Sequence, residues 1–267
     1  MDLIQVVILG VVQGLTEFLP ISSSGHLVLA EKILQIKSEN IAFEVFVHFG
    51  TFMSVVVIYR KEIRGIVKAM FGFASPSPQD PLTDDYSKLL RLLIVGTIPI
   101  AGIGLLFQDL IEKAFTSHLL ASLMLIITGA FLLSTQFSKR KSEKIKWVDA
   151  LLIGFSQACA LLPGISRSGF TIGTGLFLGI DPKKSADFSF LLALPAILGA
   201  TFLKIFELFK EEFTNQQFFG YMVGAFVAFL SGYVAIKLLL NLVKKGKFKY
   251  FGYYCIAAGI LSLLFLR

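Results

Sequence analysis

Apolar runs long enough to cross a lipid bilayer recur along this 267-residue chain. A transmembrane helix needs about 20 mostly apolar residues, because the hydrocarbon core is about 30 Å thick and a helix rises about 1.5 Å per residue. Six stretches meet this requirement: Phe43–Tyr59, Leu89–Phe107, Leu119–Phe137, Phe188–Phe206, Phe218–Leu240 and Tyr250–Leu266. Composition agrees, since 55% of the residues are hydrophobic and 16% are charged, against about 25% charged in soluble domains. The sequence predicts an all-α polytopic membrane protein and excludes a disordered chain, a disulfide-rich secreted module and an ordinary cytosolic enzyme.

Two further apolar stretches run into a polar break and are followed by a second, shorter apolar piece. They are Leu3–Leu19 with Leu27–Leu34, and Val148–Leu162 with Phe170–Ile180. Proline and glycine in the breaks end helices, and the serines there can cap new ones. Non-helical backbone at membrane depth is tolerated only where protein or a water-filled cavity surrounds it. We therefore predict two re-entrant helix hairpins in addition to the six spans.

The two breaks match each other without gaps. Residues 10–25 align on residues 154–169, and the shared residues are Gly10/Gly154, Gln13/Gln157, Ile21/Ile165, Ser22/Ser166, Ser24/Ser168 and Gly25/Gly169. Because an odd number of predicted spans separates the hairpins, the two halves have opposite orientations. We predict one integral membrane domain over residues 1–267, built as an inverted repeat with halves of about 1–137 and 138–267. Such repeats place their site near the bilayer midplane, where the breaks meet. The alternative is chance similarity between two breaks rich in glycine and serine.

The net charge of +7 is distributed as short basic clusters between apolar runs. They are Arg60, Lys61, Arg64 and Lys68; Lys139, Arg140, Lys141, Lys144 and Lys146; Lys183 and Lys184; and Lys244, Lys245, Lys247 and Lys249. All four clusters can be cytoplasmic at once, as the positive-inside rule requires. The loops around Asp109–Lys113 and Glu207–Glu212 and both termini are then outside. The first hairpin enters from the outside and the second from the cytoplasm, and no nucleic-acid partner is needed to explain the charge. Cys159 and Cys255 lack metal-binding spacing, so neither a zinc site nor a disulfide is expected.

Polar side chains suited to chemistry gather in the first break. Gln13 and Glu17 are four residues apart and share one helix face. The next helix opens on Ser22, Ser23, Ser24 and Gly25, followed by His26. A helix N-terminus of this kind is a ready anion-binding site. An ionised side chain at mid-membrane costs on the order of 2.5–3.5 kcal/mol, so we expect Glu17 to be functional rather than solvated.

The second break offers a second helix N-terminus together with Arg167, which lies between Ser166 and Ser168 and is followed by Gly169. A guanidinium group presents a planar fork that suits phosphate oxygens and keeps its charge when buried. The alternative role for Arg167 is a structural ion pair with Glu17 across the two halves. A carboxylate, a hydroxyl or imidazole nucleophile and an arginine clamp suit phosphoryl transfer, in which positioning and electrostatics supply most of the catalysis. The position at membrane depth predicts a substrate with an anionic head and a long apolar tail.

Two pairs of polar side chains, each on one helix face, have further roles to consider. Gln13 and Glu17 can hold a divalent cation, Mg²⁺ or Ca²⁺, together with substrate oxygens and water. Glu44 and His48 also share a helix face. They fit equally well as supporting partners of the site and as ordinary polar residues at the end of a span.

The sequences of the two breaks resemble those of a known protein family. Gln-Gly-Leu-Thr-Glu-Phe-Leu-Pro-Ile-Ser-Ser-Ser-Gly-His at 13–26 and Leu-Pro-Gly-Ile-Ser-Arg-Ser-Gly at 162–169 resemble the two signatures of the bacterial undecaprenyl pyrophosphate phosphatases of the bacitracin-resistance type. Gly96–Pro99 and Leu194–Ala196 also fit, and the resemblance extends over essentially the whole chain. It implies a divalent-cation-dependent enzyme of the bacterial plasma (inner) membrane. Such an enzyme removes the terminal phosphate of undecaprenyl pyrophosphate, recycles the lipid carrier for peptidoglycan synthesis and confers bacitracin resistance, with a catalytic site open to the extracytoplasmic side.

Residue by residue, the resemblance makes Glu17 a catalytic or metal-binding residue and Arg167 the phosphate-binding arginine. Ser23 and His26 match the family's proposed nucleophile and acid–base pair, and the motif leaves open which of them attacks. The family often has glutamate where this chain has Gln13, so one charged metal ligand is missing here. Glu17 is the stronger candidate ligand for that reason.

Two other classes of protein compete with this interpretation. A secondary transporter or lipid flippase shares inverted repeats and broken helices, but it has no need of a nucleophile beside an arginine clamp. A membrane scaffold leaves Glu17 and Arg167 without a role. The expected partners are a polyprenyl pyrophosphate and membrane lipid, and the sequence leaves open a homo-oligomer, the prenyl chain length and the physiological metal.

Overall fold

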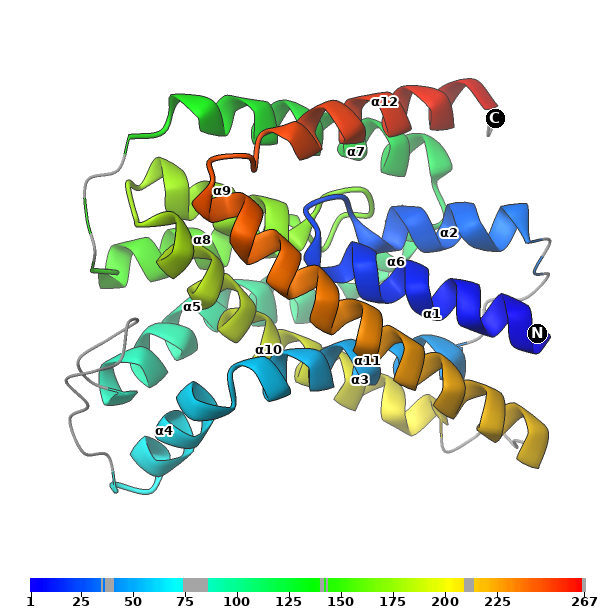
Figure 1. Ribbon diagram of the computed structural model, residues 1–267, viewed down its shortest axis with the longest axis horizontal. Helices are drawn as coiled ribbons and strands as arrows, with labels where there is room; N and C mark the ends of the chain where they lie inside the picture. The colour runs from blue at the N-terminus through cyan, green and yellow to red at the C-terminus, as the bar shows by residue number, and fades with distance from the viewer. Residues whose placement is uncertain are drawn as a thin grey trace.

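The computed structural model describes residues 1–34, 36, 41–73, 86–139, 142, 144–208 and 214–265. Its elements are helices throughout this described part (Figure 1). They are α1 (Leu3–Phe18), α2 (Ser23–Ile33), α3 (Ile41–Ile58), α4 (Arg60–Met70), α5 (Tyr86–Leu106), α6 (Gln108–Phe115), α7 (His118–Ser134), the 3₁₀ helix η1 (Thr135–Phe137), α8 (Trp147–Cys159), α9 (Arg167–Phe177), α10 (Pro182–Leu208), α11 (Asn215–Lys244) and α12 (Tyr250–Phe265). The prediction of an all-α chain is confirmed.

Four helical segments of the described chain are long and apolar enough to cross a membrane. They are α5, α7 with η1, residues Pro182–Phe202 of α10, and α11. Helix α3 makes a fifth candidate when it is taken together with α4, which is bent 87° away from it. The prediction of Tyr250–Leu266 as a sixth span corresponds to α12, whose 16 residues fall short of a full span. The chain is therefore a multi-pass membrane protein with four or five candidate spans in its described residues.

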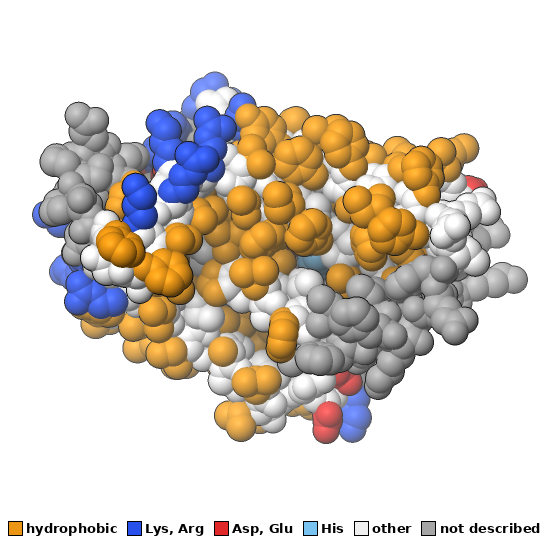
Figure 2. All heavy atoms as spheres, turned by 90° about the horizontal axis from the view of Figure 1, so that it is seen from below, with side chains coloured by type: hydrophobic (Ala, Val, Ile, Leu, Met, Phe, Trp, Pro, Cys, Tyr) orange, Lys and Arg blue, Asp and Glu red, His pale blue; other side chains and the backbone are white. Residues whose placement is uncertain are grey.

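The surface of the protein agrees with a lipid environment. Phe226, Leu230 and Val234 follow one another at four-residue intervals along α11, and all three are exposed. Figure 2 shows hydrophobic side chains over the middle of the molecule and lysine and arginine side chains gathered at one end. An exposed apolar band of this kind is expected where acyl chains surround a protein.

Helices α1 and α2 flank the first break, and α8 and α9 flank the second. Helices α2 and α9, which follow the breaks, begin earlier in the sequence than expected from the apolar pieces Leu27–Leu34 and Phe170–Ile180. Helix α9 starts within the polar break because Ser166 caps it: the Oγ of Ser166 accepts a hydrogen bond of 3.1 Å from the backbone N–H of Gly169. The chain reverses through a left-handed residue in each break, Ser22 with φ 68° in the first and Gly164 with φ 92° in the second.

The helix pairs on either side of the two breaks pack against their neighbours in similar ways. Helix α1 packs on α11, α8 packs on α5, and α7 and α12 lie side by side (Figure 1). Each hairpin crosses its partner at a glycine. A Cβ atom at Gly10 would lie 2.8 Å from the carbonyl oxygen of Gly224, and one at Gly154 would lie 2.3 Å from that of Gly96. Larger side chains at these crossings would force the helices apart.

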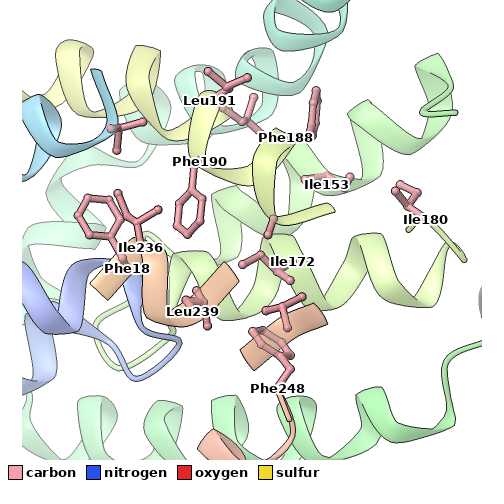
Figure 3. Packing of buried hydrophobic residues seen from close by; sticks show 14 of the residues in the cluster. Phe18, Ile153, Ile172, Ile180, Phe188, Phe190, Leu191, Ile236, Leu239 and Phe248 are labelled. Atoms are coloured by element: carbon pink, nitrogen blue, oxygen red, sulfur yellow. The ribbon is translucent and has the colours of Figure 1, made fainter. Parts of the chain in front are cut away.

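The hydrophobic core lies next to the first break. The ring of Phe18, the last residue of α1, packs edge-on against Phe190 of α10, with 5.7 Å between the ring centroids. Figure 3 shows these two side chains with Ile172 of α9 and Ile236 of α11, which belong to the same buried cluster. The residue after Glu17 therefore belongs to a core that also contains side chains from α9, α10 and α11.

The loops that carry the basic clusters meet at one end of the molecule. The hydroxyl of Tyr59, at the bend between α3 and α4, donates a 2.7 Å hydrogen bond to Asp187 of α10. At the same end, Lys249 donates to the side chain of Gln136 at 3.3 Å. The N-terminus and the end of α12 lie at the opposite end (Figure 1). Arg140, Lys141 and the 209–212 part of the predicted acidic loop lie outside the described residues.

Candidate active site

The carboxylate of Glu17 is the centre of the candidate site. It is buried at the C-terminal end of α1. Its Oε1 forms an ion pair with Nη2 of Arg167, and its Oε2 accepts hydrogen bonds from Ser23 Oγ at 2.7 Å and from Gln13 Nε2 at 3.1 Å. Four of the residues expected from the sequence are thus in contact, although Glu17 and Arg167 are 150 positions apart. The ion pair across the two halves, which the sequence offered as the alternative role of Arg167, is present.

Local structure places each of these groups. Ser23 is the first residue of α2 and Arg167 is the first residue of α9, so both breaks present a helix N-terminus to Glu17. The first break is held from α12, where Cys255 Sγ lies 3.4 Å from the carbonyl oxygen of Pro20. The second is held from α7, where the hydroxyl of Thr128 donates to the Gly164 carbonyl at 3.0 Å.

The guanidinium of Arg167 retains donors for a ligand. Its side chain is 18% exposed, so it is partly open to the surroundings. One nitrogen contacts Glu17, and Nη1 lies 3.5 Å from the carbonyl oxygen of Ala193, at the limit of a hydrogen bond. A guanidinium carries five N–H donors, and these contacts within the described chain leave several of them available. Arg167 can therefore hold Glu17 and still bind an anion.

The other serines of the breaks pair with each other. The hydroxyls of Ser22 and Ser24 are 3.2 Å apart, and those of Ser166 and Ser168 are 3.3 Å apart. These four residues were predicted to bind substrate, and in this structure their side chains order the two turns. The turns also abut, since a Cβ atom at Gly169 would lie 3.3 Å from Cβ of Pro20. At Gly25 the nearest atom to such a Cβ, Ser22 Oγ, would be 3.6 Å away.

His26 lies in the first break with both ring nitrogens engaged. Its Nδ1 is 2.9 Å from the carbonyl oxygen of Ser22, and its Nε2 is 2.7 Å from the hydroxyl of Tyr254. Because a carbonyl only accepts, Nδ1 carries the proton, and Nε2 accepts from the tyrosine. The two rings also stack, with centroids 5.6 Å apart. Tyr254 was missed by the sequence reasoning, because a tyrosine within an apolar run resembles an ordinary core residue.

His48 of α3 approaches the same carboxylate. Its Nε2 lies 4.0 Å from Oε2 of Glu17, and its Nδ1 lies 2.8 Å from the backbone carbonyl oxygen of Glu44. The carboxylate of Glu44 forms an ion pair with Lys204 of α10 at 2.8 Å. Of the two roles that the sequence allowed for this pair, His48 has that of a neighbour of the site, and Glu44 lies outside it.

The sequence model of the family described as "Bacitracin resistance protein BacA" matches residues 6–261. This chain belongs to the BacA family. Its relatives include proteins named undecaprenyl-diphosphatase from Carboxydothermus hydrogenoformans, which is 42% identical over 99% of this chain and 97% of the relative, and from Parabacteroides distasonis, 41% identical over 98% of each. A relative of the same name from Bacteroides thetaiotaomicron is 40% identical over 99% of each chain.

Ligands for a cation in this BacA-family chain are few. No three His, Cys, Asp or Glu side chains gather in a metal-binding group within the described residues. However, Gln13 Oε1 is fully buried and has no hydrogen-bond partner among them. It belongs to the amide that contacts Glu17, so an unused oxygen donor adjoins a carboxylate. Mg²⁺ is commonly bound by one or two carboxylates with substrate phosphates supplying other ligands, and the residues present fit that mode. The buried amide of Gln157, which also lacks a partner there, has no explanation in the structure.

Proposed function

We propose that this protein hydrolyses undecaprenyl pyrophosphate to undecaprenyl phosphate and inorganic phosphate. Membership of a family whose relatives are named undecaprenyl-diphosphatase makes it a phosphatase, a hydrolase acting on a phosphoric anhydride. The observation that carries the chemistry is the convergence of a serine hydroxyl and an arginine on one buried glutamate. The product would return to peptidoglycan synthesis as lipid carrier, and faster recycling would confer resistance to bacitracin.

In this proposal Ser23 is the nucleophile. Its Oγ attacks the terminal phosphorus while its proton passes to Oε2 of Glu17, with which it already shares a 2.7 Å hydrogen bond. The bond from that phosphorus to the bridging oxygen breaks, and undecaprenyl phosphate leaves. Water then attacks the phosphoserine, releases inorganic phosphate and restores the hydroxyl. His26 is the less suitable nucleophile because Ser22 and Tyr254 occupy both of its nitrogens.

Arg167 and the two helix N-termini would stabilise the charge on the transferred phosphoryl group. Phosphoryl transfer proceeds through a loose transition state with charge on the equatorial oxygens, so positioned donors matter more than a strong base. This suits a glutamate that is held in place by a neighbouring guanidinium. A divalent cation, Mg²⁺ or Ca²⁺, would be held by Glu17 and Gln13 and would neutralise part of the pyrophosphate charge when bound.

We further propose that the six predicted spans and two re-entrant hairpins form an inverted repeat with halves of about 1–137 and 138–267. The pairing of α1 with α11 and of α8 with α5 supports it, as do the equivalent crossings at Gly10 and Gly154. The two serine pairs at equivalent positions add support. The chain would lie in the bacterial inner membrane with its basic end in the cytoplasm and its site open to the extracytoplasmic side.

Phosphate release from undecaprenyl pyrophosphate by the purified protein tests the function. Arg167→Ala should lower turnover by about 10²–10³-fold or more, the effect typical of losing an electrostatic donor at the reacting group. Arg167→Lys is the matched variant, because it keeps a positive charge beside Glu17 but loses the planar fork, and it should retain an intermediate rate. A folded parent protein that released no phosphate would contradict the proposal and favour transport. Parental turnover in Arg167→Ala would remove Arg167 from the mechanism.

A further inference from the structure

The imidazole of His48 has a fixed tautomer. Its Nδ1 lies 2.8 Å from the backbone carbonyl oxygen of Glu44, one helical turn earlier in α3. Since a carbonyl oxygen has no proton to give, Nδ1 must be the donor, and in the neutral ring Nε2 then carries a lone pair. A histidine that ligates a metal nearly always donates its other N–H to a backbone carbonyl or a carboxylate in this way. His48 therefore has the arrangement of a metal ligand.

That lone pair faces a second Lewis base. Nε2 of His48 lies 4.0 Å from Oε2 of Glu17. Two acceptors have no attraction for each other unless a cation or a proton lies between them. Metal–ligand bonds of about 2.0–2.2 Å place two ligand atoms about 3–4.4 Å apart, depending on the angle at the ion. The separation of His48 and Glu17 falls within this interval.

A third donor adjoins the pair. Gln13 donates its amide N–H to the same Oε2 of Glu17, and its Oε1 is buried without a partner in the described structure. The opposite oxygen of Glu17 is paired with Arg167, so the charges of glutamate and arginine cancel. A cation should therefore bind strongly only when the pyrophosphate adds its negative charge.

We propose that His48 is a nitrogen ligand of the divalent cation that accompanies the pyrophosphate, with Glu17 and Gln13 as oxygen ligands. The inference rests on the proposed function for the identity of the substrate. It also changes the expected metal. Oxygen-only sites suit Mg²⁺, Ca²⁺ and Mn²⁺, whereas an imidazole ligand favours a later transition ion such as Zn²⁺. His48 supplies the nitrogen in a site where Gln13 supplies no charge.

Pulsed electron paramagnetic resonance of bound Mn²⁺ tests the proposal. The chain has three histidines, His26, His48 and His118. The protein is purified with a tag free of histidine and loaded with Mn²⁺ and a methylene-bridged diphosphonate analogue of a prenyl pyrophosphate. The parent should show the echo modulation of a directly coordinated ¹⁴N nucleus. His48→Gln should lose that modulation and bind Mn²⁺ more weakly, while His118→Gln, altered at the exposed start of α7, should match the parent.

Each contrary outcome overturns the proposal. These outcomes are nitrogen modulation that persists in His48→Gln, bound Mn²⁺ without nitrogen modulation in the parent, and no Mn²⁺ binding by the parent with the analogue. A protonated His48 that merely pairs with Glu17 would give the second outcome. Phosphate release is measured separately on the same preparation. Release without a nitrogen signal refutes the role of His48 alone, whereas a nitrogen signal without release refutes the proposed function alone.

Discussion

Ser23 and Arg167 occupy equivalent positions in the two breaks, and both contact Glu17. One position of the repeat thus supplies a hydroxyl in one half and a guanidinium in the other. The flanking serines kept the same residue type and pair with each other in both halves. Within the two serine turns, the position that differs between the halves contacts Glu17, and the flanking serines that match pair with each other.

Ser23→Ala and Ser24→Ala separate these two roles. Ser23→Ala should reduce phosphate release by at least about 10²-fold, because the hydroxyl bonded to Glu17 is the proposed attacking group. Ser24→Ala should stay within a few-fold of the parent, since its hydroxyl pairs only with Ser22 in the described contacts. Acid-quenched mass spectrometry of the parent should find phosphate on Ser23. Equal losses in the two variants would show that the turn, and not a nucleophile, had been damaged.

The sequence was sufficient to single out Glu17, Ser23 and Arg167, which the structure brings into contact, because charged or clustered polar residues are rare in apolar segments and conspicuous there. It was not sufficient to rank His26 and His48. The ring of His26 is directed toward Tyr254, a residue 228 positions away, and His48 reaches Glu17 from another helix. Both relations depend on how α3 and α12 pack against the first hairpin, which no local pattern encodes.

At the level of elements, the bend between α3 and α4 lies where the predicted span Phe43–Tyr59 ends. The sequence located the end of the apolar run, but it did not show that the chain continues as a helix turned by 87°. Tyr59 at the bend donates to Asp187, which is buried and also paired with Lys183 at 2.8 Å. This contact is between segments far apart in sequence, and it fixes the bend against α10.

Tyr59→Phe should lower stability while leaving the active site intact. Losing a hydrogen bond to a buried charged group costs about 1.5–3 kcal/mol, which corresponds to a fall in Tm of about 3–12 °C for a chain of this size. Thermal unfolding in one detergent provides the measurement. Tyr253→Phe is the control, because Tyr253 is an exposed tyrosine of α12, and its Tm should remain close to that of the parent. An unchanged Tm in Tyr59→Phe would mean that the bend is held by other contacts.

For the molecule as a whole, the positive-inside rule assigns the end with the lysine-rich loops to the cytoplasm. The structure gathers basic loops at one end, and Figure 2 shows them there. The grouping follows from charge and span order, which are visible in sequence. The lengths of the helices cannot be inferred from the sequence in the same way. Helix α12 is shorter than a full span, and α4 continues α3 at an angle.

Cysteine labelling in intact cells tests the orientation. In a background with Cys159 and Cys255 replaced by alanine, Gln108→Cys on α6 should react with a membrane-impermeant maleimide. Lys247→Cys, in the exposed loop between α11 and α12, should react only after the membrane is permeabilised. The reverse pattern would invert the topology and place the site on the cytoplasmic side.

The pairing of Glu17 with Arg167 also determines when the enzyme can first act. The ribosome makes the carboxylate 150 residues before its guanidinium partner, and at about 5–20 residues per second this interval lasts roughly 8–30 s. Throughout that time the nascent chain lacks the arginine that the proposed mechanism uses to hold a phosphoryl group. On the proposed mechanism, activity therefore arises only once Arg167 has been made and has reached Glu17, as one of the later events of biosynthesis.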